Sequence, residues 1–190
     1  MSATGRDYLR RIATSAKRLD ALIQDVLSYS RVVRSDLRLE AVEVGALIRE
    51  IIESYPNLHA PEAEISVRGE IPPVLGNMAA LTQVISNLLG NAVKFVREGV
   101  RPKVEISAEA KGESVRIWFE DNGIGIPQEV QHKLFQMFQR LHSPGEYEGT
   151  GMGLTIVRKA MERMGGKAGV ESEPGRGSRF WIELRRAAEA

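Results

Sequence analysis

The sequence predicts an α+β protein: a two-layer α/β sandwich with a mixed, mostly antiparallel sheet, helices on one face of the sheet, and one long α-helix before it. Three observations support this fold class. Apolar residues recur at steps of three and four through residues 6–34, which is the period of an amphipathic helix. Beyond residue 38, short strand-like and helix-like runs alternate. Turn-forming residues connect two pairs of the strand-like runs, as in antiparallel hairpins.

The first element is a long helix over residues 6–34, followed by a linker that runs into a short strand by residue 42. A lone amphipathic helix is marginally stable in water, so its apolar stripe needs a partner. Residues 1–38 carry eight Lys or Arg and four Asp, a net charge of +4, which is typical of a solvated helix face. We therefore expect two parts, an arm over residues 1–38 and a domain over residues 39–190.

Within the domain, the sequence predicts helices that alternate with short strands. Asn77 is a plausible N-cap, and Pro127 fits the first turn of a helix, where its missing N–H costs nothing. The expected helices are 44–55, 78–96, one that begins at Pro127, and 152–164. The expected strands are 63–68, 72–75, 103–110, 114–121, 168–172 and 178–184. Residues 141–151, rich in Gly, Ser, Pro and Glu, form a loop.

The composition excludes several classes of protein. The 190 residues carry a net charge of +1 and no cysteine, so a disulfide framework and thiolate metal sites are excluded. No apolar run approaches the roughly 18 residues of a membrane span, and no signal peptide is present. We expect a cytoplasmic chain that contacts neither nucleic acid nor membrane.

Three polar residues share one face of the predicted helix 78–96. Asn87, Asn91 and Lys94 stand at i, i+4 and i+7, so they form one stripe on a helix that otherwise carries core residues. A solvent-facing polar edge would explain them. The alternative is a site where amide oxygens coordinate Mg²⁺ and the ammonium meets a phosphate.

Two glycine-rich stretches follow. In residues 121–127 (DNGIGIP), Asp121 ends a strand, and Gly123 and Gly125 allow a close approach of the backbone to a ligand; a simple tight turn is the alternative. In residues 149–154 (GTGMGL), three glycines lead directly into a helix. Backbone N–H groups and the positive end of a helix form an anion site there, although the lysine of a P-loop is absent.

Together with residues 135–140 (FQMFQR), these stretches resemble the motifs of sensor histidine kinases. Residues 87–95, 121–127, 135–140 and 149–154 are similar, in this order, to the N box, first glycine box, F box and second glycine box. The resemblance covers nearly the whole chain and implies a histidine-kinase-like ATPase fold that binds ATP with Mg²⁺.

The resemblance also implies a role for each residue. Asn91 would be the Mg²⁺ ligand, with Asn87 assisting, and Lys94 would contact phosphate oxygens. Asp121 would accept a hydrogen bond from the adenine amino group. Residues 141–151 would be the ATP lid, with Phe135 and Phe138 anchoring its base in the core. The remaining residues expected to contact the nucleotide are Gly123, Gly125, Ile126, Phe138, Arg140, Gly149, Thr150, Gly151, Met152, Gly153 and Leu154.

Asn87 distinguishes a kinase from a hydrolase of the same fold. The related ATPases carry a glutamate four residues before the Mg²⁺-binding asparagine, where it orients the attacking water. An amide cannot act as a general base, a role worth roughly 10²–10⁴-fold in rate. We therefore favour transfer of the γ-phosphate to a delivered nucleophile. The alternatives are an ATP-hydrolysing module and a non-catalytic nucleotide-binding module of the same fold.

The phosphoacceptor histidine of such kinases has no counterpart among His59, His132 and His142, which we interpret as surface residues. The helix 6–34 resembles the second helix of the dimerisation hairpin, which follows the phosphoacceptor helix. We expect a fragment that binds ATP without phosphorylating itself and that self-associates through its apolar stripe. The resemblance implies three partners: the phosphoacceptor helix of the same kinase, a response regulator receiver domain, and a second copy in a full-length homodimer.

Overall fold

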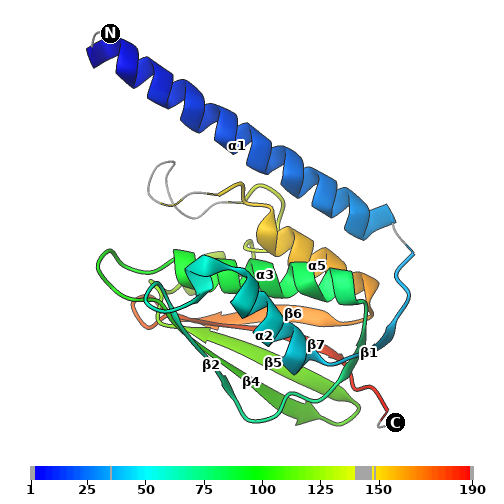
Figure 1. Ribbon diagram of the computed structural model, residues 1–190. Coiled ribbons are helices and arrows are strands. Elements are labelled where there is room, and N and C mark those ends of the chain that lie inside the picture. Colours follow the sequence, from blue (N-terminus) through cyan, green and yellow to red (C-terminus); the bar gives the residue numbers. More distant parts are fainter. Residues whose placement is uncertain (1–2, 35, 140–146, 148, 189–190) are drawn as a thin grey trace.

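A computed structural model of the chain describes residues 3–34, 36–139, 147 and 149–188. Helices cover one face of a five-stranded sheet, and a long helix lies across this helix layer (Figure 1). The predicted sandwich with one long preceding helix is confirmed.

The main sheet is mixed and mostly antiparallel, as predicted. Its strands, in spatial order, are β2 (Glu64–Arg68), β4 (Lys103–Lys111), β5 (Ser114–Asp121), β7 (Ser178–Arg185) and β6 (Lys167–Ser172). Only the β2–β4 pair in this sheet is parallel. A small second sheet pairs β1 (Glu40–Val42) with β3 (Val74–Gly76). The register of β5 on β7 sets Asp121 opposite Ser178, which positions the functional site described below.

Three helices form the layer over the sheet: α2 (Val44–Ser54), α3 (Met78–Lys94) and α5 (Gly153–Arg163). The predicted N-cap of α3 is confirmed, since Asn77 Oδ1 accepts the N–H of Ala80 at 3.1 Å. A short 3₁₀ turn, η1 (Pro56–Leu58), follows α2.

The helix expected after Pro127 is much shorter than the others. It spans four residues as α4 (Gln128–Gln131), with Pro127 at the N-cap and not in the first turn. Beyond it the backbone makes i→i+3 turns, such as the bond from Leu134 N–H to Gln131 O. Gln131 instead donates its side-chain amide to the carbonyls of Ile126 and Ser172, so the chain is tied to the glycine-rich turn and not extended as a helix.

The core lies between the sheet and the helices. The spacing of apolar residues along the strands and helices explains which side chains are buried in it. Alternate residues of the strands point inward, as Ile117 and Phe119 do on β5, and the apolar stripes of α3 and α5 face them. On the outer face, Trp118 and Trp181 flank Arg116, whose guanidinium lies 3.9 Å from the Trp181 ring centroid. The aromatic residues of β5 and β7 therefore divide between the core and the outer face of the sheet.

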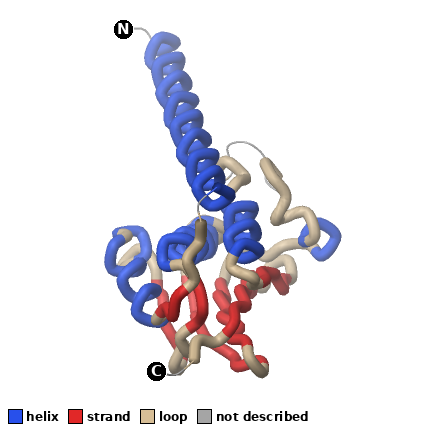
Figure 2. Tube along the Cα trace, turned by 90° about the vertical axis from the view of Figure 1, so that its right-hand side faces the viewer, coloured by secondary structure: helices blue, strands red, loops and turns tan. Residues whose placement is uncertain are grey.

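The N-terminal part of the long helix α1 (Ala3–Arg34) projects away from the domain, and the C-terminal part of α1 contacts α5 (Figures 1 and 2). Arg163, the last residue of α5, donates to the carbonyls of Val32, at 2.9 Å, and Val33. Much of the apolar stripe stays exposed, including Leu9, Ile12 and Ile23. Self-association through this stripe stays a prediction. Within the described residues, no helix has both the length and the hydrophobicity that crossing a membrane requires.

A pair of substitutions tests the position of the core. Leu89 is fully buried in α3, whereas Val100 is 43% exposed in a loop. Leu89→Ala should lower the free energy of unfolding by about 3 kcal/mol through lost packing and a residual cavity. Val100→Ala should change it by less than about 0.5 kcal/mol. Urea unfolding measures both, and equal effects would contradict this assignment of the core.

Candidate functional site

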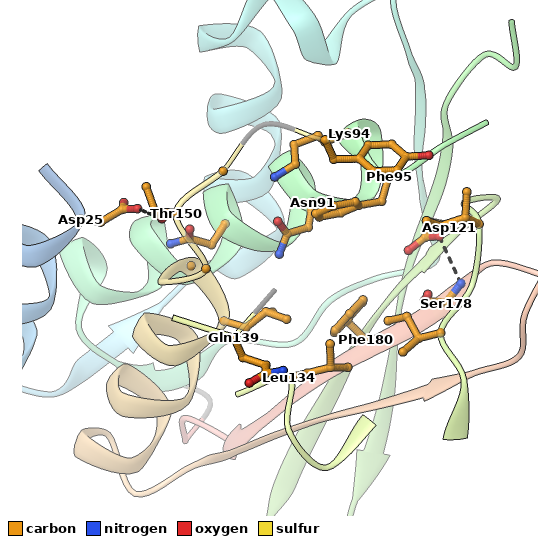
Figure 3. A pocket seen from close by; sticks show the side chains of 18 of the residues that line it. Asp25, Asn91, Lys94, Phe95, Asp121, Leu134, Gln139, Thr150, Ser178 and Phe180 are labelled. Atoms are coloured by element: carbon orange, nitrogen blue, oxygen red, sulfur yellow. Dashed lines mark hydrogen bonds between the residues drawn. The ribbon is translucent and has the colours of Figure 1, made fainter. Parts of the chain in front are cut away.

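A pocket of about 310 Å³ lies over α3, bounded by the ends of β5 and β7 and by the chain that leads into α5 (Figure 3). Most of the predicted site residues line it, and they come from three of the stretches described above: 87–95, 121–127 and 149–154. Those that line it are Asn87, Asn91, Lys94, Asp121, Gly125, Ile126, Gly149, Thr150, Gly151, Gly153 and Leu154. Gly123, Phe138 and Met152 do not line it, and Arg140 lies outside the described residues.

The polar stripe of α3 forms one wall of the pocket, and glycines make the space for it. Asn87 donates its Nδ2 to the carbonyl of Gln83 at 2.8 Å, so its Oδ1 is directed away from that carbonyl. A Cβ on Gly153 would lie only 2.7 Å from this oxygen. A Cβ on Gly149 would lie 2.8 Å from Lys94 Nζ. The first residue of α5 and the chain before it therefore approach α3 closely because Gly153 and Gly149 lack side chains.

Asp121 lies at the opposite end of the pocket and is only 9% exposed. Its Oδ1 accepts two backbone N–H groups, from Gly123 at 2.9 Å and Ser178 at 3.1 Å. Gly123 thus orients the carboxylate without lining the pocket. Within the described chain both of these bonds fall on Oδ1, which leaves Oδ2 to meet a ligand.

Two glycines hold the turn after Asp121 against the turn before Ser178. Gly177 has φ +83°, and a Cβ there would overlap the carbonyl oxygen of Asp121. Gly125 has φ +73°, and a Cβ there would overlap the carbonyl of Glu173. Both positions require positive φ and backbone contact, which only glycine supplies at low cost.

Burial raises the pKa of Asp121 from 3.8 to about 6. Desolvation disfavours the charged carboxylate, and the neighbouring Glu120 adds a smaller repulsion. The two backbone hydrogen bonds oppose the increase without cancelling it. At neutral pH the site therefore holds an ionised, poorly solvated acceptor.

A hydroxyl network that the sequence did not reveal supports this end of the pocket. Ser172 Oγ accepts the N–H of Ile126 at 2.9 Å, donates to the carbonyl of Gly177 at 2.8 Å, and lies 2.9 Å from Ser178 Oγ. Serines in strands have no motif of their own, so only the strand register could have located them.

Aromatic residues and the chain after α4 form another wall of the pocket. The rings of Phe95 and Tyr147 lie 5.2 Å apart, and Tyr147 donates its hydroxyl to the carbonyl of Val96 at 3.1 Å. Leu134 is buried and lines the pocket, and Phe135 packs partly against the core.

The prediction that Phe138 anchors the base of the lid in the core is wrong. Its side chain is 60% exposed, and its φ of +59° turns the chain away from a helical path. This turn brings the backbone at Gln139 against Gly151, where a Cβ would lie 2.9 Å from the Gln139 carbonyl. Of the predicted lid loop 141–151, residues 141–146 and 148 lie outside the described residues.

The arm contributes to the pocket, which the sequence did not predict. Ala21 and Asp25 of α1 line it, and Thr150 donates its hydroxyl to Asp25 Oδ2. In the sequence, Asp25 is one more charged residue on the polar side of an amphipathic helix. Nothing in its spacing distinguishes it from Asp20.

The fold and the site together define a class of protein. Residues 76–188 match the family described as histidine kinase-, DNA gyrase B- and HSP90-like ATPases, and the chain belongs to this family.

Within it, the proteins similar to this chain include sensor histidine kinases. The signal transduction histidine-protein kinase BarA of Escherichia coli strain K12 is 33% identical over 199 residues, which cover 97% of this chain and 21% of BarA. Full-length ShkA in complex with AMPPNP superposes with a TM-score of 0.76 and 31% identity, covering 100% of this chain and 41% of that chain.

The histidine kinase ThkA, in complex with the response regulator protein TrrA, shares the fold. Its TM-score is 0.73 at 24% identity, covering 98% of this chain and 53% of that chain. The chain spans about a fifth of the length of the curated relatives it matches.

The raised pKa of Asp121 predicts a stability gain on neutralising this residue. Because its pKa is higher in the folded state than in the unfolded state, stability falls as pH rises from about 4 to 6, and the cost above pH 6 reaches about 3 kcal/mol. In Asp121→Asn, Oδ1 can keep both backbone hydrogen bonds. Urea unfolding should show a gain of about 1–3 kcal/mol at pH 7.5 that nearly vanishes at pH 4. A variant less stable than the parent at pH 7.5 would contradict this account of burial.

Proposed function

We propose that this chain is the ATP-binding catalytic core of a two-component sensor histidine kinase. Residues 39–190 bind ATP with Mg²⁺ and transfer the γ-phosphate to a histidine carried by the rest of the kinase. Residues 1–38 are the second helix of its dimerisation hairpin with its linker. One observation carries the proposal: a single pocket has a buried carboxylate at one end and a polar, glycine-rich phosphate-type site at the other.

The end at Asp121 fits an adenine base. Oδ2 of the ionised carboxylate accepts a hydrogen bond from the exocyclic amino group, while buried apolar side chains such as Ile126 and Phe180 border the ring. Guanine carries a carbonyl at the corresponding position, so it would leave the buried carboxylate unpaired at a cost of about 1–3 kcal/mol. The site therefore selects adenine nucleotides over guanine nucleotides.

The end at α3 and α5 fits the triphosphate. Lys94 neutralises phosphate oxygens, and the glycine-rich residues 149–153 bring the N-terminal, positive end of α5 to the anion. Thr150 and Met152 contribute backbone to this turn, and Met152 also anchors it through its buried side chain.

The donor set at α3 fits Mg²⁺. Asn91 and Asn87 offer neutral amide oxygens, which suit an ion that also keeps substrate phosphates as ligands. Among the described residues no cluster of three or more His, Cys, Asp or Glu could hold a metal by itself. A bound Mg²⁺ would neutralise charge on the phosphates, and Asn91 and Asn87 would hold it.

Asn87 favours transfer over hydrolysis. Its Nδ2 is fixed by the carbonyl of Gln83, and its amide oxygen cannot take a proton from an attacking water. Phosphoryl transfer depends mostly on positioning and charge neutralisation, so a delivered histidine can use the same site. BarA and ShkA, which resemble this chain over nearly its whole length, support the kinase assignment.

The partners follow from this assignment. The phosphoacceptor helix of the same kinase supplies the histidine, and a receiver domain of a response regulator accepts the phosphoryl group. The ThkA structure contains such a regulator, TrrA, which supports the second partner. We further propose a homodimer in the full-length protein, located in the cytoplasm.

Incubation with γ-labelled ATP and Mg²⁺ tests the proposal. We expect the label to stay on ATP, with little free phosphate, because neither a catalytic base nor a histidine motif is at hand.

Asp121→Asn and Asn91→Ala should each weaken ATP binding at least about ten-fold. In Asp121→Asn an amide donor would face the adenine amino group. Binding that both variants leave intact would contradict the site assignment.

The other outcomes separate the remaining functions. Rapid release of phosphate would identify a hydrolase. Label on the chain would identify an acceptor among its own residues. If neither occurs, a dimerisation hairpin that carries a phosphoacceptor histidine is added. Labelling of the hairpin supports the kinase, and its absence indicates a non-catalytic module.

Two glycines give a matched test of the Asn87 position. In Gly153→Ala the new methyl group would meet Asn87 Oδ1 at 2.7 Å and displace the amide. We expect ATP·Mg²⁺ binding to weaken about ten-fold with little change in stability, since a single lost charge-assisted contact is worth about 1.5 kcal/mol or more. Gly90→Ala in α3 meets nothing within 4 Å, so binding should be unchanged. Calorimetry compares the two, and equal binding would contradict the role of Asn87.

A further inference from the structure

A carboxylate from α1 lies at the phosphate end of the pocket. Thr150 Oγ1 donates to Asp25 Oδ2 and accepts the N–H of Met152 at 3.3 Å. Asp25 is thereby connected to the turn that leads into α5, whose N-cap is Met152. In Figure 3, Asp25 and Thr150 lie at the side of the pocket opposite Asp121.

The position of Asp25 is fixed by more than its own hydrogen bond. At the other end of α5, Arg163 donates to the carbonyls of Val32 and Val33, and Val32 is buried. Two contacts, one at Thr150 in the turn before α5 and one at Arg163 at its end, therefore dock α1 against this helix. Any movement of α1 away from α5 would also withdraw Asp25 from the pocket.

The charge of Asp25 opposes the proposed ligand. Among the described residues that line the pocket, Lys94 is the only cation, and Asp25 and Asp121 are the only acids. Asp121 lies at the base end, whereas Asp25 lies where the triphosphate would bind. The negative charges of Asp25 and of the phosphates would repel each other strongly in a partly desolvated site. The Asp25 carboxylate also accepts the hydrogen bond that the Thr150 hydroxyl could otherwise donate to a phosphate.

We propose that Asp25 is a built-in competitor of the phosphates of ATP. When α1 is docked on α5, the carboxylate of Asp25 lowers the affinity for the nucleotide. Nucleotide binding in turn loosens the Asp25–Thr150 contact. This inference rests on the proposed function, since it assigns a regulation to the same site. By linkage, whatever shifts α1 away from α5 raises nucleotide affinity, and the coupling is equal in both directions.

Calorimetric titration of the full chain with AMPPNP and Mg²⁺ tests the competition. Asp25→Asn should lower the dissociation constant about five-fold or more. Asp20→Asn makes the same charge change on an exposed residue of the same helix that does not line the pocket, and it should change the constant by less than about two-fold. Arg163→Ala, which removes the second attachment of α1, should also lower it.

The reciprocal effect is measured by hydrogen exchange. In the parent chain, AMPPNP with Mg²⁺ should speed amide exchange in residues 20–34, and Asp25→Asn should reduce this response. A merely structural role for Asp25 would not make binding tighter.

The outcomes separate this inference from the proposed function. A parent chain that does not bind AMPPNP overturns both. Binding that is lost in Asp121→Asn but equal in the Asp25 and Asp20 variants overturns the competition alone. Weaker binding by Asp25→Asn would make this carboxylate a ligand of the nucleotide-bound metal and would likewise overturn it, as would exchange that nucleotide leaves unchanged.

Discussion

The close packing of two turns around Asp121 is the constraint on which the pocket depends. The backbone after β5 and the backbone before β7 touch at Gly125 and Gly177, where any side chain would overlap a carbonyl. This contact sets Ser178 N–H on the carboxylate and lets Ser172 tie the turn to β6. The end of the pocket proposed to hold adenine is therefore supported by the ends of β5 and β7 and not by the loop that precedes α5.

The same packing has a thermodynamic consequence. It removes Asp121 from water, and this desolvation raises the pKa of its carboxyl to about 6. Two backbone N–H groups oppose this increase, and the carboxyl is ionised at neutral pH while Oδ2 stays available. A site that recognises an amino group needs such an unsatisfied acceptor, so stability is reduced in the free protein and recovered when a donor binds.

The sequence predicted the elements that depend on local signals and missed those that depend on tertiary contact. Periodicity and residue spacing predict the apolar stripe of α3, its N-cap at Asn77 and the strand that ends at Asp121. The resemblance to the F box placed Phe138 in the core, but a left-handed turn directs it to solvent. Ser172 and Asp25 carry no motif. They reach the site only through strand register and through the docking of α1, which no local pattern encodes.

The contribution of α1 changes how the two parts of the chain relate to each other. The sequence places a boundary near residue 38, and the pocket crosses it, since Ala21 and Asp25 line the wall at the start of α5. The end proposed to hold the base is built from residues of the domain, whereas the end proposed to hold the phosphates includes Asp25 of the arm. Adenine recognition should then be indifferent to the position of α1, while phosphate binding should depend on it. An arm that moves would change affinity at the end of the nucleotide where the chemistry occurs and leave its selectivity for the base intact.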